Sequence, residues 1–376
     1  MTPTSDTDSQ ADDAHAHWMR EALWLAADAV ALSEPNPRVG CLIVSDDGTV
    51  IGRGHTQEAG GAHAEVMALR DAAAHGHSVR GATVIVTLEP CAHHGRTPPC
   101  CDALVQAGVG RVVMAIEDPN PQVAGQGAAR LRAAGIEVIV GVEADAAHEL
   151  NIGFFSRMRR GRPWVRLKVA ASLDGRTALG DGRSQWITSE AARADGHAFR
   201  RRAGAVLTGS GTLIHDDPQL DVRLVPTPRQ PLRVVLDSQL RSPLAARIYQ
   251  RPDSVLVYAA RPPADRLQAF TAHGIEVVDM ANAHGQVDLT AMLADLAQRG
   301  INELHVEAGS QLNGSLAREG LVDEYLIYLA PKLLGSGLDM AAFGPLASLA
   351  HAPQLRFHDI ERVGCDVRIL ARPLVN

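Results

Sequence analysis

The chain has 376 residues, which exceeds the roughly 100 to 200 residues of one ordinary domain and predicts two domains. Hydrophobic residues make up 46% of the chain and glycines number 34, which excludes a disordered or fibrous protein and suits a globular α/β fold. The formal net charge of -7 argues against DNA or RNA as the main partner, so small-molecule substrates are expected.

The N-terminal residues are acidic, with Asp6, Asp8 and Asp12, and lack the basic and apolar regions of a signal peptide. We predict a disordered tail over residues 1–14. No apolar run approaches the ~20 residues of a membrane helix, so no membrane partner is expected. Five cysteines in a chain of this length do not resemble a disulfide framework, and they favour a reducing, cytoplasmic compartment.

Residues 15–150 alternate between helical and strand patterns and are predicted to form the first domain. Apolar residues recur with helical spacing over residues 18–32, until Glu34-Pro35-Asn36-Pro37 ends the helix. The alternation predicts a three-layer α/β domain. Further helices are expected from about residue 62, from about residue 101 and near residue 128, and strands over residues 39–44, 83–88, 112–116 and 138–142.

The pattern breaks over residues 151–163, where four arginines crowd a stretch with glycine and proline that we interpret as a linker. A nucleic-acid patch is the alternative, but no aromatic residues are interleaved with these arginines and the chain is acidic. Residues 164–376 form the second predicted α/β domain. Its strands are expected over residues 165–169, 205–208, 232–236, 254–258, 276–278, 303–306 and 324–329.

The first domain carries the residue pattern of a zinc deaminase. His63-Ala64-Glu65 opens a predicted helix, Cys91 follows a strand, and Cys100 begins the next helix. One imidazole and two thiolates leave the fourth position of a tetrahedral zinc for the attacking water. Helix N-termini favour thiolate over thiol, which lowers the cost of metal binding. The alternative, two buried cysteines and an unrelated histidine, would have to produce this order by chance.

Glu65 is the predicted proton carrier, because it lies two residues from the metal ligand and can move a proton without binding the metal itself. Eight residues separate the two cysteines, where the common deaminase pattern has two. The longer loop includes His94 and Arg96, which could hold a phosphate or a ring edge, or could simply face solvent. The other three cysteines are not expected to bind zinc; Cys41 and Cys365 lie in apolar stretches typical of buried thiols.

The second domain has glycine-containing turns after three strands. Lys168-Val-Ala-Ala-Ser-Leu-Asp-Gly175 could let a ring or ribose approach the backbone, which by itself is a weak signal. Thr208-Gly-Ser-Gly-Thr212 and Glu307-Ala-Gly-Ser-Gln-Leu-Asn-Gly314 each run into a helix whose free amides could bind phosphate, so a dinucleotide is predicted. Neither turn is a Rossmann fingerprint. Tyr328 and Lys332 have the spacing of a short-chain dehydrogenase pair, but Pro331 and the strand pattern oppose that interpretation.

With these motifs in view, the sequence closely resembles the bifunctional deaminase/reductase family of riboflavin biosynthesis from about residue 18 to the C-terminus. The most specific stretches are Pro35-Asn-Pro-Arg-Val-Gly40, His63-Ala-Glu-Val66, Thr87-Leu-Glu-Pro-Cys-Ala-His-His-Gly-Arg-Thr-Pro-Pro-Cys100, Asp118-Pro-Asn-Pro121, Ala171-Ser-Leu-Asp-Gly-Arg-Thr177 and Ser184-Gln-Trp-Ile-Thr188.

The resemblance implies a cytidine-deaminase-like first domain that removes the 2-amino group of a diaminopyrimidinone ribosyl phosphate. It also implies a second domain, similar to dihydrofolate reductase in fold, that uses NADPH to reduce the ribosyl group to ribityl. A homodimer is expected on the same basis.

The resemblance also assigns roles residue by residue. His63, Cys91 and Cys100 are the zinc ligands, and Glu65 is the proton shuttle. The implied pyrimidine or phosphate contacts are Asn36, His94 and Asn120. The implied NADPH contacts are Ala170, Trp186, Thr212, Asp216, Ser238, Gly309, Ser310, Gln311, Leu312, Asn313, Gly314 and Ser315. The implied substrate contacts of the reductase are Lys168, Ser184, Arg200, Leu220, Arg223 and Glu307.

Guanidinium forks suit phosphate, which agrees with the implied roles of Arg200 and Arg223, although a surface position is the alternative for both. Two other classes of function stay open at this point. The chain could deaminate bases in nucleic acid, which its charge opposes. Alternatively, only the deaminase could work, with a structural remnant as the second domain.

Overall fold

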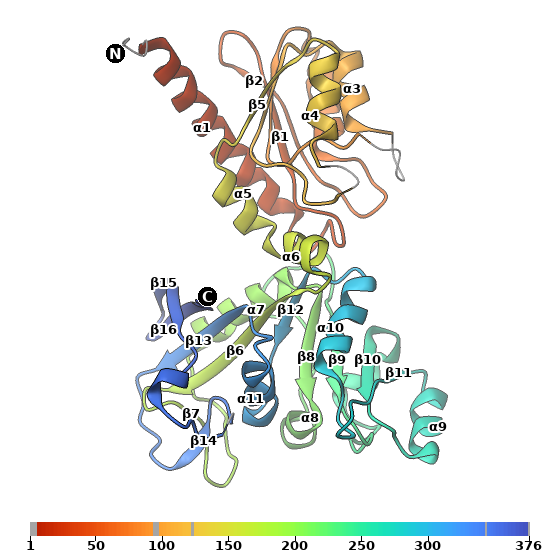
Figure 1. Cartoon of the computed structure of the whole chain (residues 1–376), viewed down its shortest axis with the longest axis vertical. Coiled ribbons are helices and arrows are strands. Elements are labelled where there is room, and N and C mark those ends of the chain that lie inside the picture. Colours follow the sequence, from red (N-terminus) through yellow and green to blue (C-terminus); the bar gives the residue numbers. More distant parts are fainter. Residues whose placement is uncertain (1–5, 93–97, 122–123, 343, 375–376) are drawn as a thin grey trace. The chain divides into compact units, whose positions relative to one another are not determined.

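The computed structural model describes residues 6–92, 98–121, 124–342 and 344–374. The chain divides into two compact units, unit 1 over Met1–Arg160 and unit 2 over Gly161–Asn376. Figure 1 colours unit 1 from red to yellow and unit 2 from green to blue. Among the described residues, no helix combines the length and hydropathy needed to span a membrane.

Unit 1 is built on a five-stranded sheet in the order β2-β1-β3-β4-β5. β1 pairs antiparallel with both of its neighbours, whereas β3, β4 and β5 run parallel. The parallel part requires crossover helices, which the sequence supplies between its strands. The strands are β1 (Gly40–Val44), β2 (Val50–His55), β3 (Thr83–Val86), β4 (Arg111–Met114) and β5 (Glu137–Val140).

Helices cover both faces of this sheet and make three layers (Figure 1). Cys41 and Ile43 of β1 pack in the core beneath α2, α3 and α4, whereas Leu42 and Val44 face α1 and α5. The period-two alternation of buried strand residues therefore divides the core in two. The helices of unit 1 are α1 (Asp6–Ala26), α2 (Ala64–Ala74), α3 (Cys100–Ala107), α4 (Gln126–Ala133), α5 (Ala144–Leu150) and α6 (Ile152–Arg160), with a short 3-10 helix η1 (Ala27–Ala29).

Three glycines let helices approach the sheet closely. A Cβ on Gly40 would lie 1.9 Å from the carbonyl oxygen of Ala22 in α1. In β2, a Cβ on Gly52 or Gly54 would lie 2.4 or 2.3 Å from α2 carbonyl oxygens, distances that no side chain tolerates. β2 was not predicted, because glycine weakens a strand pattern. Gly52 and Gly54 weaken the strand pattern in the sequence, and the same two glycines allow β2 to pack closely against α2.

The prediction of a disordered tail over residues 1–14 is wrong for its larger part, because α1 begins at Asp6. Residues 6–14 contain neither glycine nor proline, so nothing in their sequence ends a helix that is already formed further along the chain. The packed part of α1 holds Met19, Ala22 and Ala26, which are fully buried at helical spacing.

The stretch over residues 151–163, predicted as an irregular linker, is mostly helical, since α6 spans Ile152–Arg160. The helix forms because Ile152 and Phe155 are buried, while two of its arginines lie over aromatic rings. The Arg157 guanidinium lies 5.7 Å from the ring centre of Phe154, and Arg159 lies 5.0 Å from that of Phe155. These arginines cover the helix's own aromatic residues.

Unit 2 contains a nine-stranded sheet in the order β11-β10-β9-β8-β12-β6-β13-β16-β15. From β11 to β13 all neighbours are parallel, and β16 and β15 close one edge as an antiparallel pair. The strands are β6 (Trp164–Ser172), β8 (Ala205–Gly209), β9 (Leu232–Leu236), β10 (Val255–Ala259), β11 (Glu276–Asp279), β12 (Glu303–Val306), β13 (Glu324–Ala330), β15 (Leu355–Val363) and β16 (Asp366–Pro373), with a separate pair β7 (Arg176–Leu179) and β14 (Gly337–Asp339).

Helices also cover both faces of this larger sheet. α10 and α11 pack on the face that holds Leu207 and Val306, and α8 and α9 pack on the opposite face. α7 packs on Leu326 and Tyr328 of β13. The helices of unit 2 are α7 (Glu190–Arg202), α8 (Ser210–Asp216), α9 (Ala264–Ala272), α10 (Leu289–Gln298) and α11 (Ser310–Arg318), with 3-10 turns η2 (Arg247–Gln250), η3 (Pro252–Ser254) and η4 (Leu349–His351).

Candidate functional site

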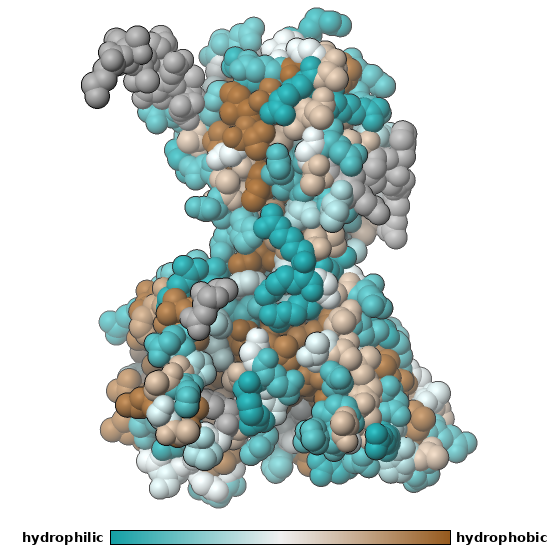
Figure 2. All heavy atoms as spheres, viewed as in Figure 1, coloured by the Kyte–Doolittle hydropathy of each residue, from teal (hydrophilic) through white to brown (hydrophobic). Residues whose placement is uncertain are grey.

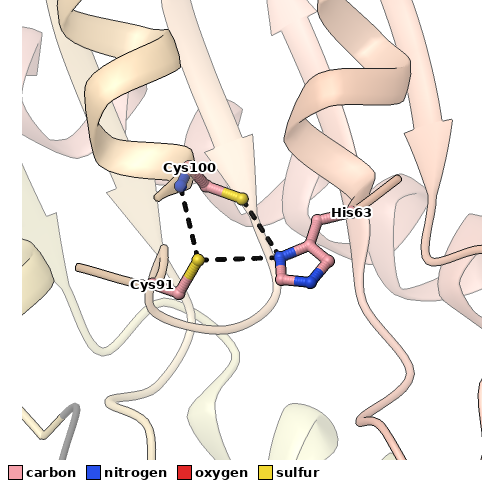
Figure 3. A group of neighbouring side chains, drawn as sticks. All are labelled: His63, Cys91 and Cys100. Atoms are coloured by element: carbon pink, nitrogen blue, oxygen red, sulfur yellow. Dashed lines mark hydrogen bonds between the residues drawn. The ribbon is translucent and has the colours of Figure 1, made fainter. Parts of the chain in front are cut away.

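Three potential metal ligands of unit 1 come together from three places in the fold. His63 is the N-cap residue of α2, Cys91 follows β3, and Cys100 is the first residue of α3. Figure 3 shows their side chains pointing toward one another, and their ligand atoms all lie within 4.8 Å. His63 Nδ1 lies 3.2 Å from Cys100 Sγ and 3.6 Å from Cys91 Sγ. The structure thus joins the three residues that the sequence selected.

These distances fit zinc. With Zn–N near 2.0 to 2.1 Å and Zn–S near 2.3 Å, tetrahedral geometry separates a nitrogen ligand from a sulfur ligand by about 3.6 Å. The His63 separations of 3.2 and 3.6 Å require little adjustment. One imidazole and two sulfurs also form the soft, three-residue donor set of a catalytic zinc site with one open position.

The start of α3 stabilises negative charge on Cys91. The backbone N–H of Cys100 donates to Cys91 Sγ at 3.3 Å. Hydrogen bonding from the Cys100 side chain is the largest cause that lowers the pKa of the Cys91 thiol, and His63 contributes as well. The pKa of Cys100 is raised, because the same interaction and burial both keep its proton. The pair therefore favours loss of the first proton from Cys91, and metal binding must displace the proton that Cys100 retains.

Glu65 lies in the first turn of α2, with 4% of its surface exposed. Burial raises the pKa of its carboxyl group, and the negative charge of Cys91 raises it further. It also interacts with the Cys100 side chain. A buried carboxyl group with a raised pKa next to the ligands is suited to accept and return a proton near neutral pH.

Glu89 is a positioning residue of this region that the sequence analysis did not select. The residue is 4% exposed, and its carboxylate accepts backbone N–H groups from Asp118 at 3.1 Å, Gly125 at 2.9 Å and Ala128 at 3.1 Å. It therefore ties the strand end that precedes Cys91 to the segment that enters α4. The available signal was its place in Glu89-Pro90-Cys91, directly before a metal ligand.

Replacing Glu89 with alanine should lower the free energy of unfolding of unit 1 by about 3 kcal/mol or more, because three N–H groups lose a buried acceptor. Glu89→Gln should cost less, since the amide oxygen still accepts. Urea unfolding, monitored by hydrogen exchange in unit 1, measures the loss of stability. Glu117→Ala, at an exposed position, is the control. A loss for Glu89→Ala no larger than that of the control would contradict this role.

The other predicted contacts of the deaminase site are less completely placed. Asn36 is half-buried in a turn, where its N–H donates to the Ser33 carbonyl oxygen at 2.8 Å. Asn120 lies in the segment that Glu89 holds, and its N–H donates to Asp118 Oδ1 at 2.8 Å. The predicted contacts His94 and Arg96 lie outside the described residues. For Asn36 and Asn120, substrate contact stays a prediction.

The remaining cysteines lie apart from the ligand group. Cys101 is buried and its thiol donates to the Pro90 carbonyl oxygen at 3.2 Å, and Cys41 is buried in β1. The expectation of a buried thiol at Cys365 is wrong, because this residue is exposed in the turn between β15 and β16. That turn lies at the edge of the sheet, so the apolar residues around it belong to an exposed hairpin.

The glycine-containing turns of unit 2 lie at the carboxyl ends of neighbouring strands in the middle of its sheet. β6, β8 and β12 are parallel neighbours, so their carboxyl ends lie together; α8 begins directly after β8, and residues 307–309 lead from β12 into α11. A Cβ on Gly309 would lie 3.6 Å from Thr212 Oγ1, and one on Gly209 would lie 3.6 Å from Leu312. The two turns therefore lie close together. Paired helix N-termini at the carboxyl ends of parallel strands are suited to bind phosphate groups.

Next to these turns, Glu307 gathers the basic residues that were predicted as substrate contacts. Arg200 donates both Nε and Nη2 to the Glu307 carboxylate, Nη2 at 2.9 Å, and Lys168 Nζ lies 3.6 Å from Glu307 Oε2. Burial would raise the pKa of Glu307, but Arg200 and Lys168 outweigh it and hold that pKa well below its usual range. The structure brings these three predicted residues together as one ion-pair network.

The other predicted reductase contacts differ in exposure and in their place in the fold. Trp186 is 62% exposed, with Arg193 stacked 4.6 Å from its ring centre. Leu220 is buried in the core with a positive φ of 54°. Arg223 is exposed and pairs with Asp221 at 2.7 Å. The further predicted contacts are Ala170 in β6, Ser184 before α7, Thr212 and the exposed Asp216 in α8, Ser238 after β9, and Ser310, Gln311 and Ser315 in α11.

Two residues of the predicted NADPH loop have structural roles in α11. Asn313 is 2% exposed and donates through Nδ2 to the Met340 carbonyl oxygen at 2.9 Å. A Cβ on Gly314 would lie 2.2 Å from the Ala342 carbonyl oxygen. These two residues pack against residues 340–342.

Tyr328 and Lys332 do not form a catalytic pair. Tyr328 lies in β13 and its buried hydroxyl donates to Asp195 Oδ2 at 2.7 Å. Lys332 Nζ donates to the Trp186 carbonyl oxygen at 3.1 Å. Tyr328 lies in a strand, as the sequence pattern predicted, and the two side chains bind different partners.

Two family profiles match the chain. The profile described as "Cytidine and deoxycytidylate deaminase zinc-binding region" matches residues 12–116, and "RibD C-terminal domain" matches residues 163–369. The riboflavin biosynthesis protein RibD of Escherichia coli (strain K12) is 47% identical over 364 residues, which cover 93% of this chain and 97% of that protein. Its counterpart in Aquifex aeolicus (strain VF5) is 40% identical over 353 residues, 94% of this chain and 97% of that protein.

Solved structures give the same result. Acinetobacter baumannii RibD, form 1, superimposes with a TM-score of 0.88 at 42% identity, over 97% of this chain and 100% of that one. The diaminohydroxyphosphoribosylaminopyrimidine deaminase/5-amino-6-(5-phosphoribosylamino)uracil reductase of Thermotoga maritima superimposes with a TM-score of 0.86 at 33% identity, with the same coverage. These similarities confirm the predicted α/β fold class, a cytidine-deaminase-like unit followed by a reductase unit.

Proposed function

The chain belongs to the RibD family of riboflavin biosynthesis proteins and is a bifunctional deaminase and reductase, and we propose how its residues divide this work. Unit 1 removes the 2-amino group of the diaminopyrimidinone ribosyl phosphate as ammonia. Unit 2 then reduces the ribosyl group of 5-amino-6-(5-phosphoribosylamino)uracil with NADPH. The observation that carries the proposal is the group of His63, Cys91 and Cys100 beside buried Glu65.

In the deaminase step, zinc held by His63, Cys91 and Cys100 supplies the acidity that makes water nucleophilic near neutral pH. Glu65 takes the proton of the attacking water and delivers it to the departing amino group. The α3 N-terminus stabilises the thiolate of Cys91 through the Cys100 N–H. Glu89 holds the strand end before Cys91 in place through its three backbone hydrogen bonds.

In the reductase step, NADPH supplies the hydride to the opened ribose. The neighbouring turns after β8 and β12 present the N-termini of α8 and α11 to its phosphate groups. Lys168, Arg200 and Arg223 bind the substrate, with Glu307 fixing the first two. The ion-pair network orients the basic side chains before the substrate arrives, which reduces the ordering cost of binding.

The reductase assignment predicts that the chain, given 5-amino-6-(5-phosphoribosylamino)uracil directly, oxidises NADPH even after zinc has been removed. The reason is that the reduction uses residues of unit 2, whereas the metal ligands belong to unit 1. The absorbance of NADPH measures the rate, and NADH serves as the comparison cofactor. Failure to consume NADPH under these conditions would remove the reductase half of the proposal.

We further propose a homodimer that forms through the outer face of the β15–β16 hairpin. A bulge between Phe357 and Asp359 changes the alternation of β15, so that Phe357 and Ile360 lie on the same face, paired with Ala371 and Ile369. Phe357 is 69% exposed and Ile360 is 56% exposed. Figure 2 shows hydrophobic side chains gathered over these strands. A twofold axis would place two such apolar faces together.

Phe357→Asp should convert the dimer into monomers, because a carboxylate would lose its hydration in an apolar interface. Light scattering after size-exclusion chromatography gives the mass, with Leu349→Asp at a 91% exposed position as control. A dimer that persists in Phe357→Asp places the interface elsewhere, and a monomeric wild type ends this part of the proposal.

The free thiols of a zinc site are best preserved in a reducing compartment, which supports a cytoplasmic location.

A further inference from the structure

His197 is a buried residue of the reductase unit with no role so far. It lies in α7, three residues before Arg200, and is 4% exposed. Its Nδ1 accepts the backbone N–H of Arg223 at 3.1 Å. Its Nε2 lies 3.4 Å from Nη1 of Arg200. Both ring nitrogens therefore face N–H groups from residues that we place in substrate binding.

A neutral imidazole can accept at only one nitrogen. Because Nδ1 accepts from the Arg223 backbone, Nε2 carries the ring proton. Burial is the main cause that lowers the pKa of His197 to about 4, with Arg200 and Arg223 adding to it, so the ring is neutral near pH 7. Its tautomer is thus fixed by the chain, with an N–H directed toward Arg200.

Two donors then converge at this point. One N–H of Arg200 Nη1 is used by the Asp221 carbonyl oxygen at 2.8 Å, while Nη1 also faces His197 Nε2. Nη1 and the protonated Nε2 cannot satisfy each other, since a guanidinium nitrogen does not accept. An oxygen that accepts hydrogen bonds from both Arg200 Nη1 and His197 Nε2 would give each of these donors a partner.

We propose that His197 Nε2–H, together with Arg200, binds an oxygen of the substrate's phosphate group. This inference rests on the proposed reductase function and adds a neutral donor to its phosphate contacts. The surrounding charges favour an anion: Lys168, Arg200 and Arg223 are cationic, against the carboxylates of Glu307 and Asp221, which leaves one positive charge. Arg223, with 47% of its side chain exposed, places one of these cations at the surface.

Two substitutions separate this role from a structural one. In His197→Asn the side-chain oxygen can replace Nδ1 as acceptor for the Arg223 N–H, but the distal donor is lost. In His197→Gln the side-chain amide can reach the position of Nε2 as donor, but the Nδ1 acceptor is lost. If Nε2–H donates to the substrate, His197→Asn should lose substrate affinity. If His197 only holds residues 221–223 in place, His197→Gln should lose it instead.

The experiment measures binding of 5-amino-6-(5-phosphoribosylamino)uracil by calorimetry, beside binding of the same compound without its phosphate. We expect His197→Asn to raise the Kd of the phosphorylated compound about tenfold, as a lost hydrogen bond to an anion does. Binding of the riboside should change less than about twofold, and His197→Gln should keep most of the affinity for the phosphate ester. NADPH binding and ammonia release serve as folding controls for each unit.

The proposal is overturned if His197→Gln loses affinity while His197→Asn keeps it. It is also overturned if either variant weakens both compounds equally. Because calorimetry needs no turnover, failure of the proposed function is recognised separately: wild-type chain that binds the phosphate ester but never oxidises NADPH contradicts the reductase assignment and leaves the His197 contact standing.

Discussion

Glu65→Gln should leave zinc bound while ammonia release falls by about a thousandfold, within the range that general acid–base catalysis contributes. The three ligands stay in place, because Glu65 is in the first turn of α2 and contributes no ligand atom to the group of His63, Cys91 and Cys100. Glutamine has nearly the same shape as glutamate but cannot carry the proton from water to the leaving amino group. Steady-state ammonia release and metal content of the purified variant measure the two effects.

The reductase of the same variant provides the control. Given the deaminated uracil directly, Glu65→Gln should oxidise NADPH at the wild-type rate, because its substitution lies in unit 1. Ammonia release within tenfold of wild type would show that Glu65 is not the proton carrier. Loss of zinc would show instead that the carboxyl group has a structural role at the metal.

Cys100→Ser should lose nearly all zinc and all deaminase activity, whereas Cys101→Ser should keep both. The two neighbours point to different partners: Cys100 Sγ lies 3.2 Å from His63 Nδ1, and Cys101 Sγ donates to the Pro90 carbonyl oxygen at 3.2 Å. A serine hydroxyl is a poor substitute for a thiolate ligand of zinc. Elemental analysis of both proteins, prepared identically, measures the difference.

Cys101→Ser is a close control, because both residues are buried at the start of α3 and both changes replace sulfur with oxygen. A general loss of folding would therefore affect the two variants alike. Equal loss of zinc from both would refute the ligand assignment, and loss only from Cys101→Ser would exchange the two cysteines in it.

The sequence predicted the parts of the fold whose signals are local. The predicted strands over residues 232–236 and 303–306 coincide with β9 and β12, although both include buried polar residues, Arg233 in β9 and Glu303 and His305 in β12. β2 and the β15–β16 hairpin were missed for two different reasons. β2 depends on Gly52 and Gly54, which read as turn residues, and β15 has a bulge and an exposed face that remove the alternation.

The metal ligands could be selected because zinc requires particular residue types in a recognisable order. Positioning residues carry no such signal. Glu89 acts through backbone N–H groups about 30 to 40 residues away in the chain, and His197 is defined by the loop that brings the Arg223 N–H to it. Contacts of that kind are set by tertiary structure alone. The pairing of Arg200 with Glu307, across 107 residues, is a further example.

The most direct test of the two-step account is an assay with the diaminopyrimidinone ribosyl phosphate that follows ammonia release and NADPH oxidation separately, with and without a zinc chelator. The account predicts both signals in the untreated enzyme. After chelation, ammonia release should stop, and NADPH oxidation should stop with it until the deaminated uracil is added. Ammonia release without any NADPH consumption, even when that uracil is supplied, would contradict the account and leave unit 2 as a structural remnant.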